Sequence, residues 1–75
     1  MSTIDEDLMN VEIRKFLKHV GITSQREIEK AVRDAAESGS LPESGELGAE
    51  ITLSVPGVGL THTIKHDLRV TKSGG

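Results

Sequence analysis

Hydrophobic residues in the first half of the chain recur every three or four positions, which places them along one side of a helix. The row comprises Met9, Ile13, Phe16, Leu17 and Val20, and then Ile28, Ala31, Val32 and Ala35. Gly21 adopts positive φ without steric cost and predicts the end of a first helix. Ser24 and Glu27 fit a capping box that begins a second helix, and Ser38-Gly39 predicts its end. We therefore expect two helices joined by a short turn, a helix–turn–helix.

The hydrophobic period changes to two in the second half of the chain, as in a strand with one apolar face. The alternating residues are Ala49, Ile51, Leu53 and Val55, followed by Leu60, Ile64, Leu68 and Val70, with His62 and His66 on the same face. Pro56-Gly57-Val58-Gly59 separates the two runs, and glycine at position 57 is compatible with a type II′ turn. The expected register pairs Val55 with Leu60, Leu53 with His62, Ile51 with Ile64 and Leu47 with Leu68. The predicted fold is therefore α+β, two N-terminal helices followed by an antiparallel β-hairpin, in the order ααββ.

The distribution of polar residues sets the expected boundaries. An acidic N-terminal tail covers residues 1–7, a single small domain covers residues 8–70, and a disordered tail covers residues 71–75. Residues 38–48, rich in Gly, Ser and Glu, are predicted to form a mobile surface loop. Phe16 is the only aromatic residue of the 75, so we expect it at the centre of a thin aliphatic core between helices and hairpin.

Three runs of the sequence carry a resemblance to a known family: residues 13–18, 20–33 and 59–62. Over roughly residues 8–70 the chain resembles a family of small bacterial proteins catalogued as a domain of unknown function. The resemblance implies a shared fold. It implies no activity and no site residues, because that family has none assigned.

The formal net charge of −3 is unevenly distributed along the chain. Residues 11–33 carry +3, whereas residues 1–10 carry −3 and residues 34–50 carry −5. The predicted helices are thus locally basic between acidic flanks, which is typical of a solvated face with intrahelical pairs such as Glu29–Arg33, or of a polyanion-binding surface. The candidate interaction surface comprises Arg14, Lys15, Lys18, Gln25, Arg26, Lys30 and Arg33 on the helices, with Thr61, Thr63 and Lys65 on the outer face of the second strand.

Two functions fit these patterns. A two-stranded sheet has two open edges, so the chain is expected to bind another protein chain, including a second copy of itself through a sheet edge. The alternative is weak nucleic-acid binding by the helix–turn–helix, with Gln25 and Arg26 at the start of the second helix and the hairpin as a wing. Glu27 and Lys30 occupy positions that DNA-reading units usually bury, which favours the protein partner.

The sequence offers little for catalysis or ligand binding. It has no cysteine, no catalytic motif and no phosphate-binding loop. His62 and His66 would lie ~13 Å apart along a strand, too far to share a metal ion. We therefore expect a protein that is not an enzyme, with no cofactor, no metal and no small-molecule substrate. The acidic N-terminus and the lack of a long apolar run predict a cytoplasmic protein without membrane contact.

Overall fold

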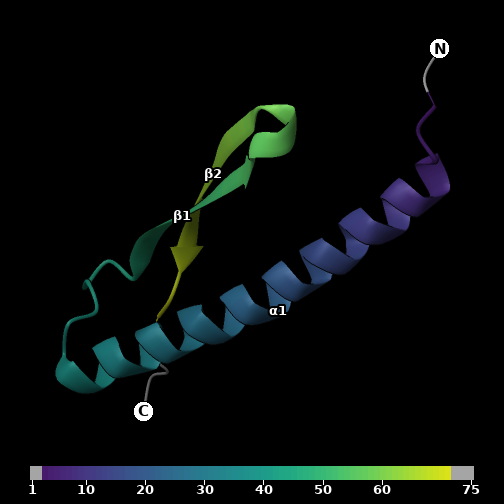
Figure 1. The fold of residues 1–75 in the computed structure, drawn as a ribbon. Helices are drawn as coiled ribbons and strands as arrows, with labels where there is room; N and C mark the ends of the chain where they lie inside the picture. The colour runs from purple at the N-terminus through teal and green to yellow at the C-terminus, as the bar shows by residue number, and fades with distance from the viewer. Residues whose placement is uncertain (1–2, 72–75) are drawn as a thin grey trace. The chain divides into compact units, whose positions relative to one another are not determined.

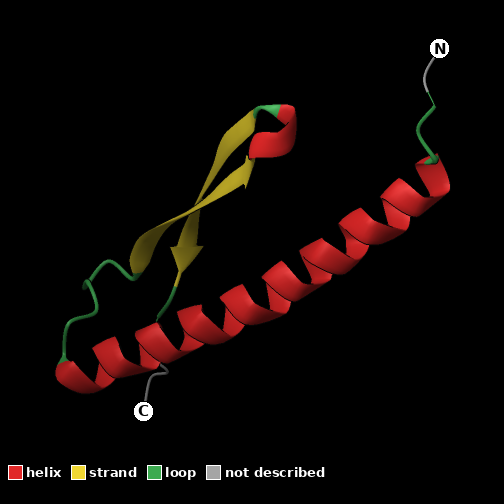
Figure 2. Cartoon of the chain, viewed as in Figure 1, coloured by secondary structure: helices red, strands yellow, loops and turns green. Residues whose placement is uncertain are grey.

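The computed structural model describes residues 3–71. It contains one long helix, α1 (Glu6–Ser38), followed by β1 (Glu46–Val55), the short 3₁₀ turn η1 (Pro56–Val58) and β2 (Leu60–Arg69) (Figures 1 and 2). The chain divides into two compact units, Met1–Ser40 with the helix and Leu41–Gly75 with the hairpin. The α+β class and the hairpin are confirmed, while the order is αββ rather than ααββ.

Helix α1 begins and ends at residues that satisfy its terminal backbone groups. The Asp5 carboxylate accepts a hydrogen bond from the Leu8 amide at 3.0 Å, and Glu6 and Asp7 place negative charge in the first turn. At the other end Gly39 has φ +75, and the Ser40 amide donates to the Ala35 carbonyl at 2.8 Å. The helix end at Ser38-Gly39 is confirmed, whereas residues 6 and 7 belong to the helix rather than to the predicted tail.

The predicted turn between two helices is wrong, because α1 continues through Gly21 and Ser24. Gly21 does not have positive φ, and Ser24 caps nothing. A glycine inside a helix costs only about 1 kcal/mol relative to alanine. Ending the helix there would instead leave up to four carbonyl and four amide groups without intrahelical partners. In a short chain with few apolar residues to pack across a turn, the continuous helix is the more favourable arrangement.

The hairpin has the register that the sequence predicts. Val55 lies opposite Leu60, and the same alignment extends down to Leu47 opposite Leu68. The predicted turn type is wrong, since residues 56–59 form a 3₁₀ turn and Gly59, at φ +68, takes the left-handed conformation instead of Gly57. The Gly59 amide donates to the Pro56 carbonyl at 3.1 Å and closes this loop. Both turns give the same cross-strand pairs, because each is centred between residues 57 and 58.

No hydrophobic side chain is buried among residues 3–71. Phe16, predicted at the centre of a core, is 52 % exposed, and no core forms around it within its own unit. The physical reason is geometric, because neither a single helix nor a two-stranded sheet can enclose its own apolar side. Each unit segregates apolar from polar residues and leaves the apolar side uncovered within itself.

Candidate functional site

One side of α1 carries a row of eight positions, which we call the helix stripe. At ~100° per residue these positions stay within about a third of the helix circumference over the whole length of α1. The helix stripe consists of Met9, Ile13, Phe16, Val20, Ser24, Ile28, Ala31 and Ala35. It passes Gly21 without a change of phase, so it is one surface rather than two.

The helix stripe contains large apolar side chains that are partly exposed. Ile13 is 48 % exposed, close to the value for Phe16, and Ile28 is 38 % exposed. Leu17 and Val32 widen the row along one of its two edges. Full burial of one such side chain contributes roughly 1.5–3 kcal/mol. Covering the helix stripe would therefore release free energy comparable to the whole stability of a small domain.

The predicted cationic residues of the helix lie mainly on the side opposite the helix stripe. Lys15, Lys18, Arg26 and Arg33 follow one another there at helical spacing, whereas Arg14 and Lys30 flank the helix stripe itself. All six are exposed.

Acidic neighbours interrupt this basic face. The Lys15 ammonium lies 3.2 Å from the Glu12 carboxylate, and the Arg33 guanidinium lies 3.9 Å from Glu29. Glu29 also accepts a hydrogen bond from the Gln25 side chain at 3.1 Å. The predicted Glu29–Arg33 pair is thus confirmed. The cations are interleaved with acids and do not make a continuous positive patch, which is the arrangement that favours a protein partner over a polyanion.

The predicted residues of the second strand lie together on the polar face of the hairpin. Thr61 lies opposite Ser54, Thr63 opposite Thr52, and Lys65 opposite Glu50. The Thr52 and Thr63 hydroxyls are 3.3 Å apart. The other face carries the apolar positions, and both β1 and β2 have one unpaired edge within the described two-stranded sheet.

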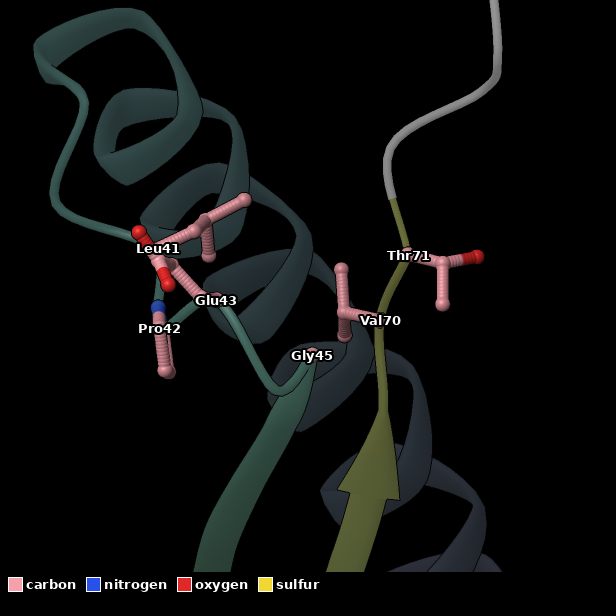
Figure 3. Close-up of a pocket in the computed structure, with 6 residues that line it drawn as sticks. All are labelled: Leu41, Pro42, Glu43, Gly45, Val70 and Thr71. Carbon is pink, nitrogen blue, oxygen red and sulfur yellow. The ribbon is translucent and has the colours of Figure 1, made fainter.

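A shallow pocket of about 310 Å³ lies at the open end of the hairpin, between the loop before β1 and the segment after β2 (Figure 3). Gly45 is the buried residue at its floor, with φ +74. Its carbonyl accepts a hydrogen bond from the Val70 amide at 2.6 Å, and its amide donates to the Pro42 carbonyl at 3.0 Å. The pocket is lined by Leu41, Pro42, Glu43, Gly45, Val70 and Thr71. Glu43 is the only ionisable side chain among these lining residues, and the two hydrogen bonds of Gly45 close this end of the hairpin.

The histidines and carboxylates of the described chain do not gather into a metal site. His62 lies opposite Leu53 and His66 opposite Ala49, both exposed on the apolar face of the hairpin. No group of three or more metal-binding side chains occurs among residues 3–71.

Within the same residues, α1 is too polar to cross a membrane and there is no other long helix.

Two features of the described structure were not predicted from the sequence, namely the exposure of the helix stripe and the role of Gly45. The helix stripe was assigned to an internal core, and Gly45 was not singled out. The signal for the first was present, because Val20, Ser24 and Ile28 are each four residues apart and keep the same phase across Gly21. The second had no local signal, because Gly45 is one of several glycines in a polar loop.

One comparison with known proteins is informative. The model of a family described as a family of unknown function (DUF6494) matches residues 4–71, which include the helix and the hairpin. The chain belongs to this family. The resemblance noted in the sequence is thereby confirmed, and the family of unknown function brings no assigned role to any residue. No curated protein and no solved structure matches the chain.

Proposed function

We propose that this chain is a small non-catalytic protein–protein interaction module of the cytoplasm, whose helix stripe is covered by another protein chain. The observation that carries the proposal is the helix stripe, which its own unit leaves uncovered. Phe16, Ile13 and Ile28 are on one side of α1 and between 38 % and 52 % exposed, in a chain with no buried hydrophobic side chain among residues 3–71. Exposed apolar rows of this kind, rimmed by polar residues, mark interaction surfaces.

Charge and shape support a protein partner rather than nucleic acid. The nucleic-acid alternative depended on a turn that presents Gln25 and Arg26 at the start of a second helix. Both residues lie instead in the middle of α1, where no helix terminus points at a ligand. The interleaved acids Glu12 and Glu29 also weaken attraction to a polyanion. The proposal assigns no reaction to the chain.

The test is an affinity purification from the native organism with quantitative mass spectrometry, comparing three tagged forms of the chain. Phe16→Asp puts a charge on the helix stripe. Ile22→Asp is its matched control, because Ile22 is also exposed, at 45 %, lies in the same helix and is on the opposite side. We expect a protein partner, which includes the untagged chain itself, to be retained by wild type and Ile22→Asp and lost with Phe16→Asp. Equal recovery with all three forms, or recovery of nucleic acid alone, would contradict the proposal.

A further inference from the structure

The helix stripe has the same spacing in both directions along α1. Its successive intervals are four, three, four, four, four, three and four residues, which places the eight positions symmetrically about residue 22. If a second copy of α1 runs antiparallel to the first and both are centred at residue 22, each position of one helix stripe lies level with a position of the other. We propose that the partner covering the helix stripe is a second copy of this chain, paired antiparallel about a two-fold axis level with Ile22. This inference rests on the proposed function and names its partner.

The sizes of the side chains favour this orientation. The N-terminal half of the helix stripe is bulky and the C-terminal half is mostly small. Antiparallel pairing sets Met9 against Ala35, and Ile13 against Ala31, of the second copy. Large against small at these two outer levels lets the ends of the two helices approach equally closely. Parallel pairing would place Phe16 on its own counterpart and Ala35 on its own counterpart, so the helices would splay at one end.

The central levels combine one pair of large side chains with one pair of a medium-sized and a small side chain. Phe16 meets Ile28 of the second copy, and Val20 meets Ser24. Each of these contacts occurs twice because of the two-fold symmetry, as in an isologous interface. Over the 26 steps from Met9 to Ala35 the row extends ~39 Å at a rise of 1.5 Å per residue. An interface of this length uses the whole of the helix stripe rather than a part of it.

Charges beside the helix stripe agree with the same alignment. Glu12 and Lys30 lie along the same edge of the helix stripe. A two-fold axis perpendicular to both helices places this edge of one copy next to the same edge of the other copy. In the proposed alignment Glu12 of one copy lies within one helical turn of Lys30 of the other. Lys30 has no ion-pair partner among the described residues, and Glu12 has Lys15 within its own helix. Two symmetric attractive pairs therefore flank the row and help to set its register.

Cross-linking tests the orientation directly. The chain has no cysteine, so Met9→Cys and Ala35→Cys each introduce a single thiol, and cysteine behaves as a small apolar residue at either position. In the proposed dimer, a bismaleimide much shorter than 39 Å joins Met9→Cys of one chain to Ala35→Cys of another. We expect a covalent dimer when the two variants are mixed and none with either variant alone. Dimers formed by one variant alone would overturn the antiparallel arrangement.

A charge exchange tests the register. Glu12→Lys should weaken dimerisation several-fold in sedimentation equilibrium, and Glu12→Lys with Lys30→Glu should restore it. Glu29→Lys is the matched control, because Glu29 also pairs with a base in its own helix, Arg33, but lies away from the helix stripe. A loss that Glu29→Lys reproduces, or that the double exchange does not restore, would overturn the proposed register.

Failure of this inference is distinguishable from failure of the proposed function. A wild-type chain that stays monomeric at high micromolar concentration overturns the second copy as partner. If Phe16→Asp then still loses a protein that Ile22→Asp retains, the module has a different partner. If a dimer forms and Phe16→Asp does not disrupt it, the dimer interface lies elsewhere, as at the open edge of β2, and pairing through the helix stripe is wrong. The affinity purification with Phe16→Asp and Ile22→Asp then still decides the proposed function.

Discussion

Closure of the hairpin at Gly45 gives the sharpest prediction from the structure. A Cβ atom added at this position would lie 2.7 Å from the Val70 carbonyl oxygen and 3.4 Å from the Thr71 side chain. The first distance is shorter than any ordinary contact, and the obstructing atom belongs to the backbone. Gly45 also has φ +74, a conformation that side chains disfavour. Gly45→Ala should therefore displace the segment after β2 from the loop before β1.

The loss of stability expected for Gly45→Ala is the sum of two unfavourable contributions and one favourable contribution. The left-handed conformation costs an alanine roughly 1–2 kcal/mol. Displacing Val70 also weakens the hydrogen bond from its amide to the Gly45 carbonyl, with a net cost of about 0.5–1.5 kcal/mol. Alanine recovers about 0.4–1 kcal/mol by restricting the unfolded chain. The net destabilisation is about 2 kcal/mol, a large fraction of what a unit this small possesses.

Gly39→Ala is the matched control. Gly39 has almost the same φ, +75, but an added Cβ would have no neighbour within 4 Å. Gly39→Ala should therefore cost only about 1 kcal/mol, the conformational part alone.

Urea unfolding followed by circular dichroism, with amide hydrogen exchange at Val70, measures both variants. Protection of the Val70 amide should fall in Gly45→Ala and persist in Gly39→Ala. Equal effects of the two substitutions on unfolding, or unchanged Val70 protection in Gly45→Ala, would refute the predicted contact.

Two further substitutions test the helix. Gly21→Ala should stabilise α1 by about 0.5–1 kcal/mol, because Gly21 lies inside the helix and an added Cβ meets nothing within 4 Å. A melting temperature lower than that of wild type would indicate that the helix is interrupted at Gly21. Asp5→Ala should destabilise the helix N-terminus by about 1 kcal/mol through loss of the bond to the Leu8 amide, whereas Asp5→Asn should retain most of the stability. Thermal unfolding by circular dichroism checks both, and an Asp5→Asn variant as unstable as Asp5→Ala would argue against the cap.

The hairpin could be predicted from the sequence because its determinants are local. Alternation of apolar and polar residues places one set on one face, and the Pro56–Gly59 segment lies midway between the two runs. Together they leave one register that keeps Ile51 and Ile64 on the same face, and this register is observed. The turn type was less determined, since Gly57 and Gly59 both permit positive φ and only the loop geometry selects Gly59.

The candidate interaction surface was only partly predictable. The cationic residues were recognised from their charge and are all exposed, although acids accompany them. The helix stripe was read as an internal core, because an apolar row has the same spacing whether its own chain or another chain covers it.

The sequence by itself determined the amphipathic side of the helix, its end at Gly39 and the pairing of the strands, because spacing, capping and alternation act over a few neighbouring residues. The tertiary structure decided whether Gly21 ends a helix and whether Phe16 becomes buried. These outcomes depend on differences of about 1 kcal/mol per residue and on what is available to pack against each surface. It also decided the role of Gly45, since the Val70 carbonyl that excludes a side chain there is 25 residues away along the chain.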